Sequence, residues 1–120
     1  MKAHWTSFLR GQPKRRGRMN QTEADYAAIL TIRQHAGEVL WFAYEAITLR
    51  LADNTRYTPD FIVELADGTL EIHEVKGFWK EAAKLRLKVA AETFPFRFVS
   101  IRLRPKKEGG GWEFTNFTKE

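Results

Sequence analysis

The segment that most constrains the fold runs over residues 57–79 and has the pattern of a β-hairpin. Val and Ile recur among polar residues in FIVEL and again in LEIHEV, and Ala-Asp-Gly separates the two runs. Runs of this kind are typical of half-buried strands, and Asp-Gly between them favours a tight turn. We therefore predict two antiparallel strands joined by a short turn.

This hairpin places three ionisable side chains at one end of a sheet. Asp60 follows Pro59 at the start of the first strand, and Glu74 and Lys76 stand near the end of the second. Because side chains alternate along a strand, Glu74 and Lys76 project on one side and Val75 projects on the other. Antiparallel pairing brings the start of one strand beside the end of its partner, so we expect Asp60 to lie near Glu74.

Two neighbouring carboxylates beside an ammonium group predict a site for a divalent cation. Mg²⁺ is usually held by one or two carboxylates and waters, and adjacent carboxylates without a cation repel each other. We expect Asp60 and Glu74 to bind Mg²⁺ or Mn²⁺, with the backbone carbonyl of Val75 as a third ligand. Lys76 would then orient a water or stabilise charge on a phosphate, which is chemistry suited to phosphodiester hydrolysis.

Composition limits the class of protein. With 120 residues, 43% of them hydrophobic, the chain is long enough for one domain with a packed core. The absence of cysteine excludes disulfides and thiolate metal sites and favours a cytoplasmic location. No apolar run approaches the ~18 residues of a membrane span, and the basic start is unlike a signal peptide. The net charge of +5 points to a polyanionic partner.

Residues 1–19 contain several cations and no acid, without helical or strand periodicity. We predict a flexible basic arm here and a single domain over residues 20–120. The arm either contacts nucleic-acid phosphates or serves as a solubilising tail. The cations expected to contact phosphates in the first case are Lys14, Arg15, Arg16 and Arg18.

A first helix is predicted to begin at Asn20 or Thr22 and to end near Ala36. Asn20 and Glu23 have the spacing of a capping box, in which each side chain satisfies a backbone N–H of the other residue. Glu23 therefore has two interpretations. It either caps the helix or points from the first turn toward the end of the sheet that carries Asp60.

The remaining pattern predicts an α/β fold with a mixed β-sheet flanked by helices. Strands are expected over 40–44 and 47–51, with a bend between them and a turn at Asp53-Asn54 before the hairpin. A helix over 80–93 and a strand over 96–103 would complete a βαβ unit, with the last strand parallel to the one bearing Glu74. Residues 112–117 have the pattern of an edge strand. The predicted core order is α-β-β-β-α-β.

The second helix carries a basic ridge and follows two aromatic residues. Like charges four residues apart repel, so the ridge either meets phosphates or remains a solvated face. Its candidate DNA-binding residues are Lys80, Lys84, Arg86 and Lys88. Phe78 and Trp79 either stack against bases or pack at the helix entry. His73 must face away from Glu74, and we interpret it as a packing or surface histidine.

The combination of Asp60 with Glu74-x-Lys76 on this order of elements resembles the PD-(D/E)XK nucleases, the restriction-endonuclease-like superfamily. The longer strings NQTEADYAAIL, YTPDF and HEVKGFW are similar to small phage-borne members related to Holliday-junction resolvases. The likeness covers approximately residues 20–103.

The resemblance implies a Mg²⁺-dependent DNA endonuclease, selective for branched DNA and active in recombination. It implies Asp60 and Glu74 as metal ligands and Lys76 as the catalytic lysine. It also implies Glu23 as an accessory ligand, because an acid on the first helix often joins the metal site in this superfamily. Cutting two strands symmetrically requires two sites, so we expect a homodimer. The alternatives are a non-catalytic nucleic-acid-binding module and a phage assembly protein.

Overall fold

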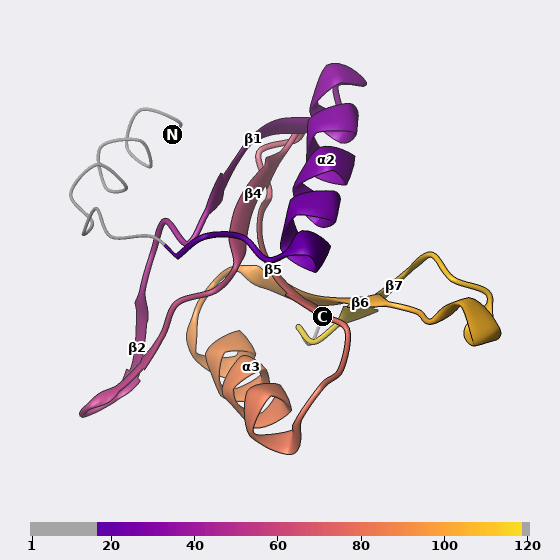
Figure 1. Cartoon of the computed structure of the whole chain (residues 1–120). Coiled ribbons are helices and arrows are strands. Elements are labelled where there is room, and N and C mark those ends of the chain that lie inside the picture. The colour runs from indigo at the N-terminus through magenta and orange to yellow at the C-terminus, as the bar shows by residue number, and fades with distance from the viewer. Residues whose placement is uncertain (1–16, 119–120) are drawn as a thin grey trace.

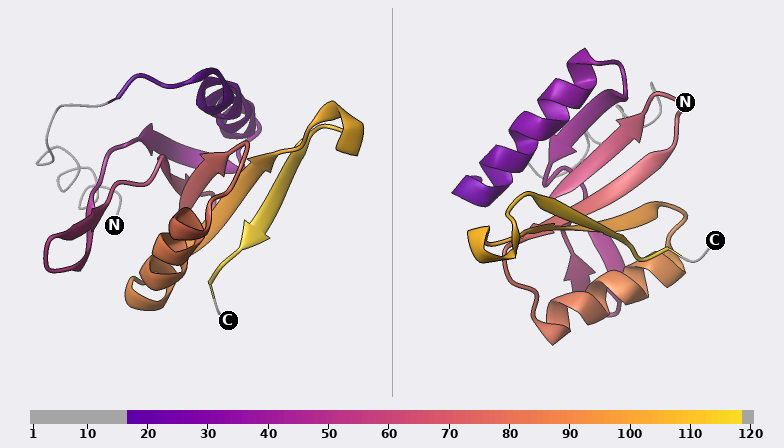
Figure 2. Two further views of the ribbon diagram at one scale, coloured as in Figure 1. Left: turned by 60° about the horizontal axis from the view of Figure 1, so that its bottom comes forward. Right: turned by 90° about the vertical axis from the view of Figure 1, so that its right-hand side faces the viewer.

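The computed structural model describes residues 17–118 and contains a mixed sheet with a helix on each face. Figure 2 shows the sheet lying between the two helices. Five strands form this sheet in the order β1-β4-β5-β6-β7, and β2 and β3 form a separate hairpin. The element bounds are α2 Gln21–His35, β1 Val39–Tyr44, β2 Leu49–Ala52, β3 Thr55–Tyr57, β4 Phe61–Leu65, β5 Leu70–Lys76, α3 Glu81–Thr93, β6 Arg97–Leu103, η1 Lys106–Glu108 and β7 Trp112–Asn116.

The predicted hairpin is present as the antiparallel pair β4 and β5, with Phe61 opposite His73. Gly68 occupies the turn with φ +90°, a conformation that glycine adopts without the steric cost of a Cβ. After α3 the chain returns as β6, which runs parallel to β5 as predicted. β7 then pairs antiparallel with β6 and forms the far edge of the sheet.

The face of the sheet under α2 (Figure 1) contains an apolar layer and a buried polar chain. Asn20 is the N-cap of α2, and both halves of the capping box with Glu23 are present. Tyr26 packs here, and its hydroxyl lies 2.7 Å from Nδ1 of His73. The other ring nitrogen of His73 lies 2.8 Å from Glu71 Oε1. His73 is therefore a buried packing histidine on the face opposite Glu74.

The opposite face is covered by α3, and the β2–β3 hairpin packs beside that helix (Figure 1). Leu87 and Ala90 of α3 are buried against Ile72 and Phe98 of the sheet. Leu85 and Val89 of the same helix are exposed. The helix therefore buries only a narrow stripe of its surface.

The number of strands between the helices differs from the prediction. Five strands connect α2 to α3, because β3 adds to the four strands expected over 40–44, 47–51 and the hairpin. Of these, β1, β4 and β5 belong to the main sheet. The chain leaves β1 at Glu45, which has φ +45°, and turns back at Asn54, which has φ +61°. The 47–51 run thus forms part of a local hairpin outside the main sheet. Within residues 17–118, no helix is long and apolar enough to cross a bilayer.

Candidate functional site

Asp60 and Glu74 meet at the junction of β4 and β5, as the antiparallel register requires. The backbone N–H of Asp60 donates to Oε1 of Glu74 at 3.0 Å. The N–H of Val75 donates to Oδ2 of Asp60 at 2.8 Å. The two residues are only 5% and 6% exposed. Each acid is thus fixed by the backbone that carries the other.

Lys76 completes the group predicted from the sequence. Its Nζ lies 3.4 Å from Oε2 of Glu74, on the same side of β5. Lys76 is half-buried, so its ammonium group retains access to solvent. Asp60, Glu74 and Lys76 therefore occupy one site at the carboxyl end of the parallel pair β5–β6, which is where ligands commonly bind in sheets of this kind.

Tyr57 is a member of this site that sequence reasoning missed. Its hydroxyl donates to Oε1 of Glu74 at 2.8 Å. Burial and the charge of Glu74 raise the pKa of Tyr57 well above its usual range, so the phenol remains a donor. Tyr57 ends β3, and only the folding of the β2–β3 hairpin onto α3 brings it here. The sequence offered its position three residues before Asp60 as the only signal.

The electrostatics of the site favour a positive charge. Burial, followed by the charge of Glu74, raises the pKa of Asp60 to about 8, against the opposing effects of the Val75 N–H and Lys76. Burial likewise raises the pKa of Glu74, although the bond from Tyr57 and the charge of Lys76 oppose the shift. Without a further cation, the pair therefore retains a proton near neutral pH.

The donor set fits a hard divalent cation. Among the described residues, no donor reaches Oδ1 of Asp60, and Oε2 of Glu74 contacts only Lys76. The N–H of Val75 points toward Asp60. Because the carbonyl of a strand residue points to the same side as its N–H, the Val75 carbonyl also faces the side of Asp60. Two carboxylates and a carbonyl are ligands of the kind Mg²⁺ accepts. Residues 17–118 contain no cluster of three or more His, Cys, Asp or Glu side chains with metal-site spacing.

Glu23 lies outside that pair and serves as a cap. Its Oε1 accepts the N–H of Asn20 at 3.0 Å and the hydroxyl of Tyr44 at 2.9 Å. Glu23 is also buried and close enough to contribute to the raised pKa of Asp60. Glu23 thus both caps α2 and lies near the site. Its role as an accessory metal ligand remains a prediction.

Glu45 links the start of the described chain to the site. Its N–H donates to the carbonyl oxygen of Asp60 at 2.8 Å. Its carboxylate accepts the N–H of Gly17 at 2.7 Å. The segment that leads into α2 is therefore attached beside the loop that carries Asp60.

The predicted DNA-contacting cations of α3 are on the surface. The exposed residues are Arg18, Lys80, Lys84, Arg86 and Lys88, whereas Lys14, Arg15 and Arg16 lie outside the described residues. Lys84 contacts Glu81 at 3.8 Å. This surface begins four residues after Lys76, so the basic helix directly follows the site.

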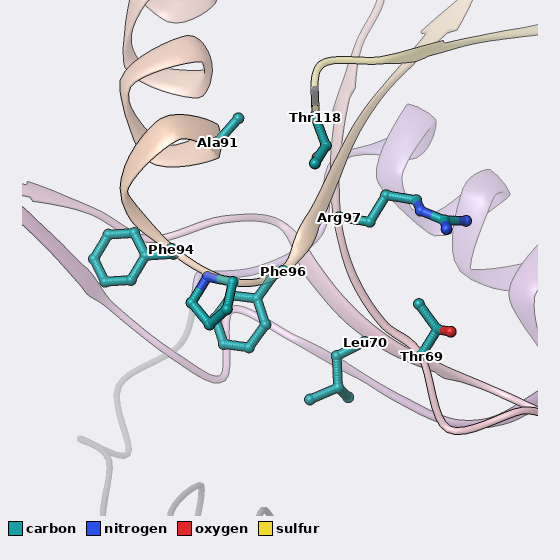
Figure 3. Close-up of a pocket in the computed structure, with 8 residues that line it drawn as sticks. Thr69, Leu70, Ala91, Phe94, Phe96, Arg97 and Thr118 are labelled. Atoms are coloured by element: carbon teal, nitrogen blue, oxygen red, sulfur yellow. The ribbon is translucent and has the colours of Figure 1, made fainter. Parts of the chain in front are cut away.

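A cavity of 640 Å³ lies at the opposite end of the sheet (Figure 3). Leu70 and Arg97, which begin β5 and β6, line it together with the end of α3. Figure 3 shows Phe94 and Phe96 at its rim. None of the residues of the acidic site lines this cavity, so the two features are separate.

Comparisons of the chain with protein-family models, with curated proteins and with solved structures gave no match.

Proposed function

We propose that the chain is a divalent-metal-dependent endonuclease that hydrolyses phosphodiester bonds in DNA. The observation that carries this proposal is the convergence of Asp60, Glu74 and Lys76 in one group at a sheet end, with the two acids buried and Lys76 half-buried. The likeness of these positions to the PD-(D/E)XK pattern supports the same function. We also propose that the mixed sheet and its two helices form a restriction-endonuclease-like fold.

The residues have separate roles in the proposed reaction. Asp60 and Glu74 would hold Mg²⁺ or Mn²⁺ through the oxygens that face away from their backbone donors, with the Val75 carbonyl beside them. Mg²⁺, when bound, supplies charge neutralisation at the phosphate and a water of lowered pKa. Lys76 donates from Nζ toward the attacked phosphate or the attacking water and stabilises developing negative charge. Tyr57 holds Glu74 in its orientation, and Glu23 supports the site from α2.

The exposed cations of α3 would bind the DNA backbone. Lysine and arginine side chains exposed along a helix are suited to phosphate oxygens, so most contacts would be to phosphates. We therefore propose selectivity for DNA structure, with branched DNA as the preferred substrate. Each lysine of the ridge that contacts a phosphate should add about one unit to the salt dependence of binding.

Strand cleavage on both sides of a junction would use a homodimer. β7 lies at the sheet edge with Phe114 52% exposed, which makes it a candidate contact. Light scattering at micromolar concentration measures this directly, and the expected mass is twice that of the chain. A monomeric mass with and without DNA would remove the dimer from the proposal.

The cleavage experiment uses four-way, flap, nicked and continuous duplex DNA with Mg²⁺ or Mn²⁺. Wild-type protein should cut at least one branched substrate, and EDTA should abolish cleavage. Asp60→Asn and Lys76→Ala should each lower the rate by a factor of at least about 100, because each removes a group that stabilises transition-state charge. Glu64→Gln is the matched control, since Glu64 is a buried acid of β4 that lies outside the site. Wild-type rates in the Asp60 or Lys76 variant would contradict the assignment.

A non-catalytic nucleic-acid-binding module is the second candidate. It is favoured by the exposed basic helix together with the lack of a three-ligand metal cluster among residues 17–118. This function predicts salt-sensitive DNA binding that is the same in Mg²⁺ and in EDTA. The cleavage experiment separates the two, because a binding module would nick no substrate with either cation.

A further inference from the structure

A groove of 440 Å³ lies on the α3 face of the sheet, next to the acidic site. Its lining residues are Phe78, Trp79, Lys84, Ser100, Arg102, Glu113, Thr115 and Phe117. They come from the loop after β5, from α3, and from β6, β7 and the residue that follows β7. The volume falls within the range of about 300–1,000 Å³ that is typical of small-molecule sites.

The sheet register places this groove one strand away from the catalytic group. Ser100 pairs with Glu74, and Arg102 pairs with Lys76, across the parallel β5–β6 ladder. Residues paired in this way project on the same face from strands about 4.8 Å apart. A ligand in the groove would therefore be continuous with a phosphate bound at Glu74 and Lys76.

The wall of the groove next to the site is aromatic. Phe78 and Trp79 follow Lys76 with only Gly77 between them. Phe78 is 77% exposed, so its ring is available for contact with a ligand. Aromatic rings presented in this way stack on bases that have left the helical stack, whereas the bases of a continuous duplex cannot reach them.

Trp79 provides an independent sign of a missing ligand. Its Nε1 is buried, and it is the one buried side-chain N or O atom in residues 17–118 without a hydrogen-bond partner. A buried donor without a partner is costly, and such groups are rare in native structures. A nucleobase presents carbonyl and ring-nitrogen acceptors that would satisfy this N–H once the indole ring turns it toward the groove.

The polar residues of the groove suit the rest of a nucleotide. Arg102 is held by Glu113 at 3.2 Å and by Glu108 at 3.1 Å, so its guanidinium is fixed in the floor of the groove and the two acids offset its charge. Ser100 and Thr115 add hydroxyls beside it, and Lys84 provides a cation at the entrance. Mixed donors and acceptors next to aromatic rings match a base with its sugar and phosphate better than an apolar peptide.

We propose that this groove binds an unpaired nucleotide of the DNA strand that is cut at Asp60, Glu74 and Lys76. This inference rests on the proposed nuclease function and specifies its substrate as DNA with an unstacked base beside the scissile phosphate. Selectivity for branched DNA then follows from the groove, because a continuous duplex offers no free base to it.

The test measures binding by fluorescence anisotropy with Ca²⁺ in place of Mg²⁺. Two probes are compared, a continuous duplex and the same duplex with an unpaired 2-aminopurine nucleotide. Wild-type protein should bind the unpaired probe about tenfold or more tightly, in line with the stacking of one base. Binding should also change the 2-aminopurine fluorescence.

Three variants make the test specific. Phe78→Ala should abolish the preference for the unpaired probe without weakening binding to the duplex. Leu85→Ala is the matched control, because Leu85 is an exposed apolar residue of α3 outside the groove and should leave both affinities unchanged. Trp79→Phe keeps an aromatic ring and removes the N–H, so it should reduce the preference for the unpaired probe. A preference equal to that of wild type in this variant would contradict the assignment of the N–H to a ligand.

The outcomes separate this inference from the proposed function. If cleavage depends on Lys76 but the protein shows no preference for the unpaired probe, the groove assignment is wrong and the nuclease proposal stands. The same holds if the preference survives Phe78→Ala. A preference that depends on Phe78 without cleavage of any substrate overturns the nuclease and leaves the groove. A chain that binds neither probe overturns both.

Discussion

At the scale of the residue, the hydroxyl of Tyr57 determines how Glu74 is presented. It donates to the same carboxylate oxygen that accepts the N–H of Asp60, which leaves the other oxygen facing Lys76. Partners of this kind orient ligands without touching the metal, and their loss commonly costs about 10–100-fold in metal affinity or activity. Tyr57 is thus a positioning residue.

Replacing Tyr57 with Phe tests this role. The ring remains to fill its place in the core, so the protein should fold, but Glu74 loses one of its two fixed donors on Oε1. We expect the Mg²⁺ concentration required for half-maximal cleavage to rise about 10–100-fold. Tyr26→Phe removes a buried hydroxyl on the opposite face of the sheet and serves as the control. An unchanged Mg²⁺ titration for Tyr57→Phe would show that Glu74 is held without it.

The raised pKa of Asp60 predicts how the metal-free protein responds to pH. The ordinary pKa is 3.8 and the folded value is about 8, so the folded state binds more protons across that window. Stability contributed by this group is therefore fully present below the ordinary pKa and is lost as pH rises through about 8. Thermal unfolding in EDTA should give a melting temperature that falls toward pH 8, and Asp60→Asn should flatten that part of the profile. A wild-type profile identical to that of Asp60→Asn would contradict the shared proton.

At the scale of the element, the β4–β5 hairpin and the start of α2 were predictable because their signals are local. The Asp-Gly turn, the strand lengths and the Asn20–Glu23 capping box depend on residues a few positions apart. The hairpin alone placed Asp60 near Glu74. Its register was sufficient because the turn and the apolar pattern fix which residues pair, and Phe61 opposite His73 brings Asp60 beside Glu74.

Features that depend on tertiary packing could not be predicted in this way. The β2–β3 hairpin resembles any half-buried strand in sequence, and its separation from the main sheet depends on positive φ angles at Glu45 and Asn54. Tyr57 joins the site only through that hairpin. Likewise, the groove is built from β6, β7, α3 and the loop after β5 together, so no single segment carries its pattern.

A polar chain connects three elements on the α2 face and provides a prediction for stability. Glu71 of β5 bonds His73 at 2.8 Å and Arg97 of β6 at 3.3 Å, and His73 in turn bonds Tyr26 of α2. Burial acts to raise the pKa of Glu71, but the bond from His73 and the charge of Arg97 outweigh it, so the pKa is lowered. The ionised carboxylate therefore stabilises the fold.

Glu71→Gln should lower the free energy of unfolding by about 1–3 kcal/mol at neutral pH, because a charged acceptor in a buried network is lost. A lowered pKa contributes stability above the ordinary glutamate pKa, and that stability is lost as pH falls through the folded value. The difference between wild type and variant should therefore shrink in acid. Urea unfolding at about pH 7 and about pH 4 measures it. Glu113→Gln is the control, because it breaks an exposed ion pair with Arg102 and should change the free energy of unfolding by no more than about 1 kcal/mol. An equal loss of unfolding free energy in Glu71→Gln and Glu113→Gln would contradict a special role for the buried network.

At the scale of the whole molecule, the two faces of the sheet carry different features. The α2 face holds the buried polar chain, and the α3 face holds the acidic site, the groove and the basic helix. The carboxyl ends of β5 and β6 are the place where these features meet. A net charge of +5 would attract DNA to the molecule generally, and the local carboxylate pair would select the point at which a metal-bound phosphate is held.

Binding of Mn²⁺ to the purified chain, followed by electron paramagnetic resonance, tests the proposed metal site most directly, because it asks whether Asp60 and Glu74 hold a divalent cation. We predict that wild-type protein binds Mn²⁺ saturably and that Mg²⁺ displaces it. Asp60→Asn and Glu74→Gln should each weaken Mn²⁺ binding at least about tenfold, and the control Glu64→Gln should bind Mn²⁺ as wild type does. Equal Mn²⁺ affinity in wild type and in both site variants would contradict the proposed metal site.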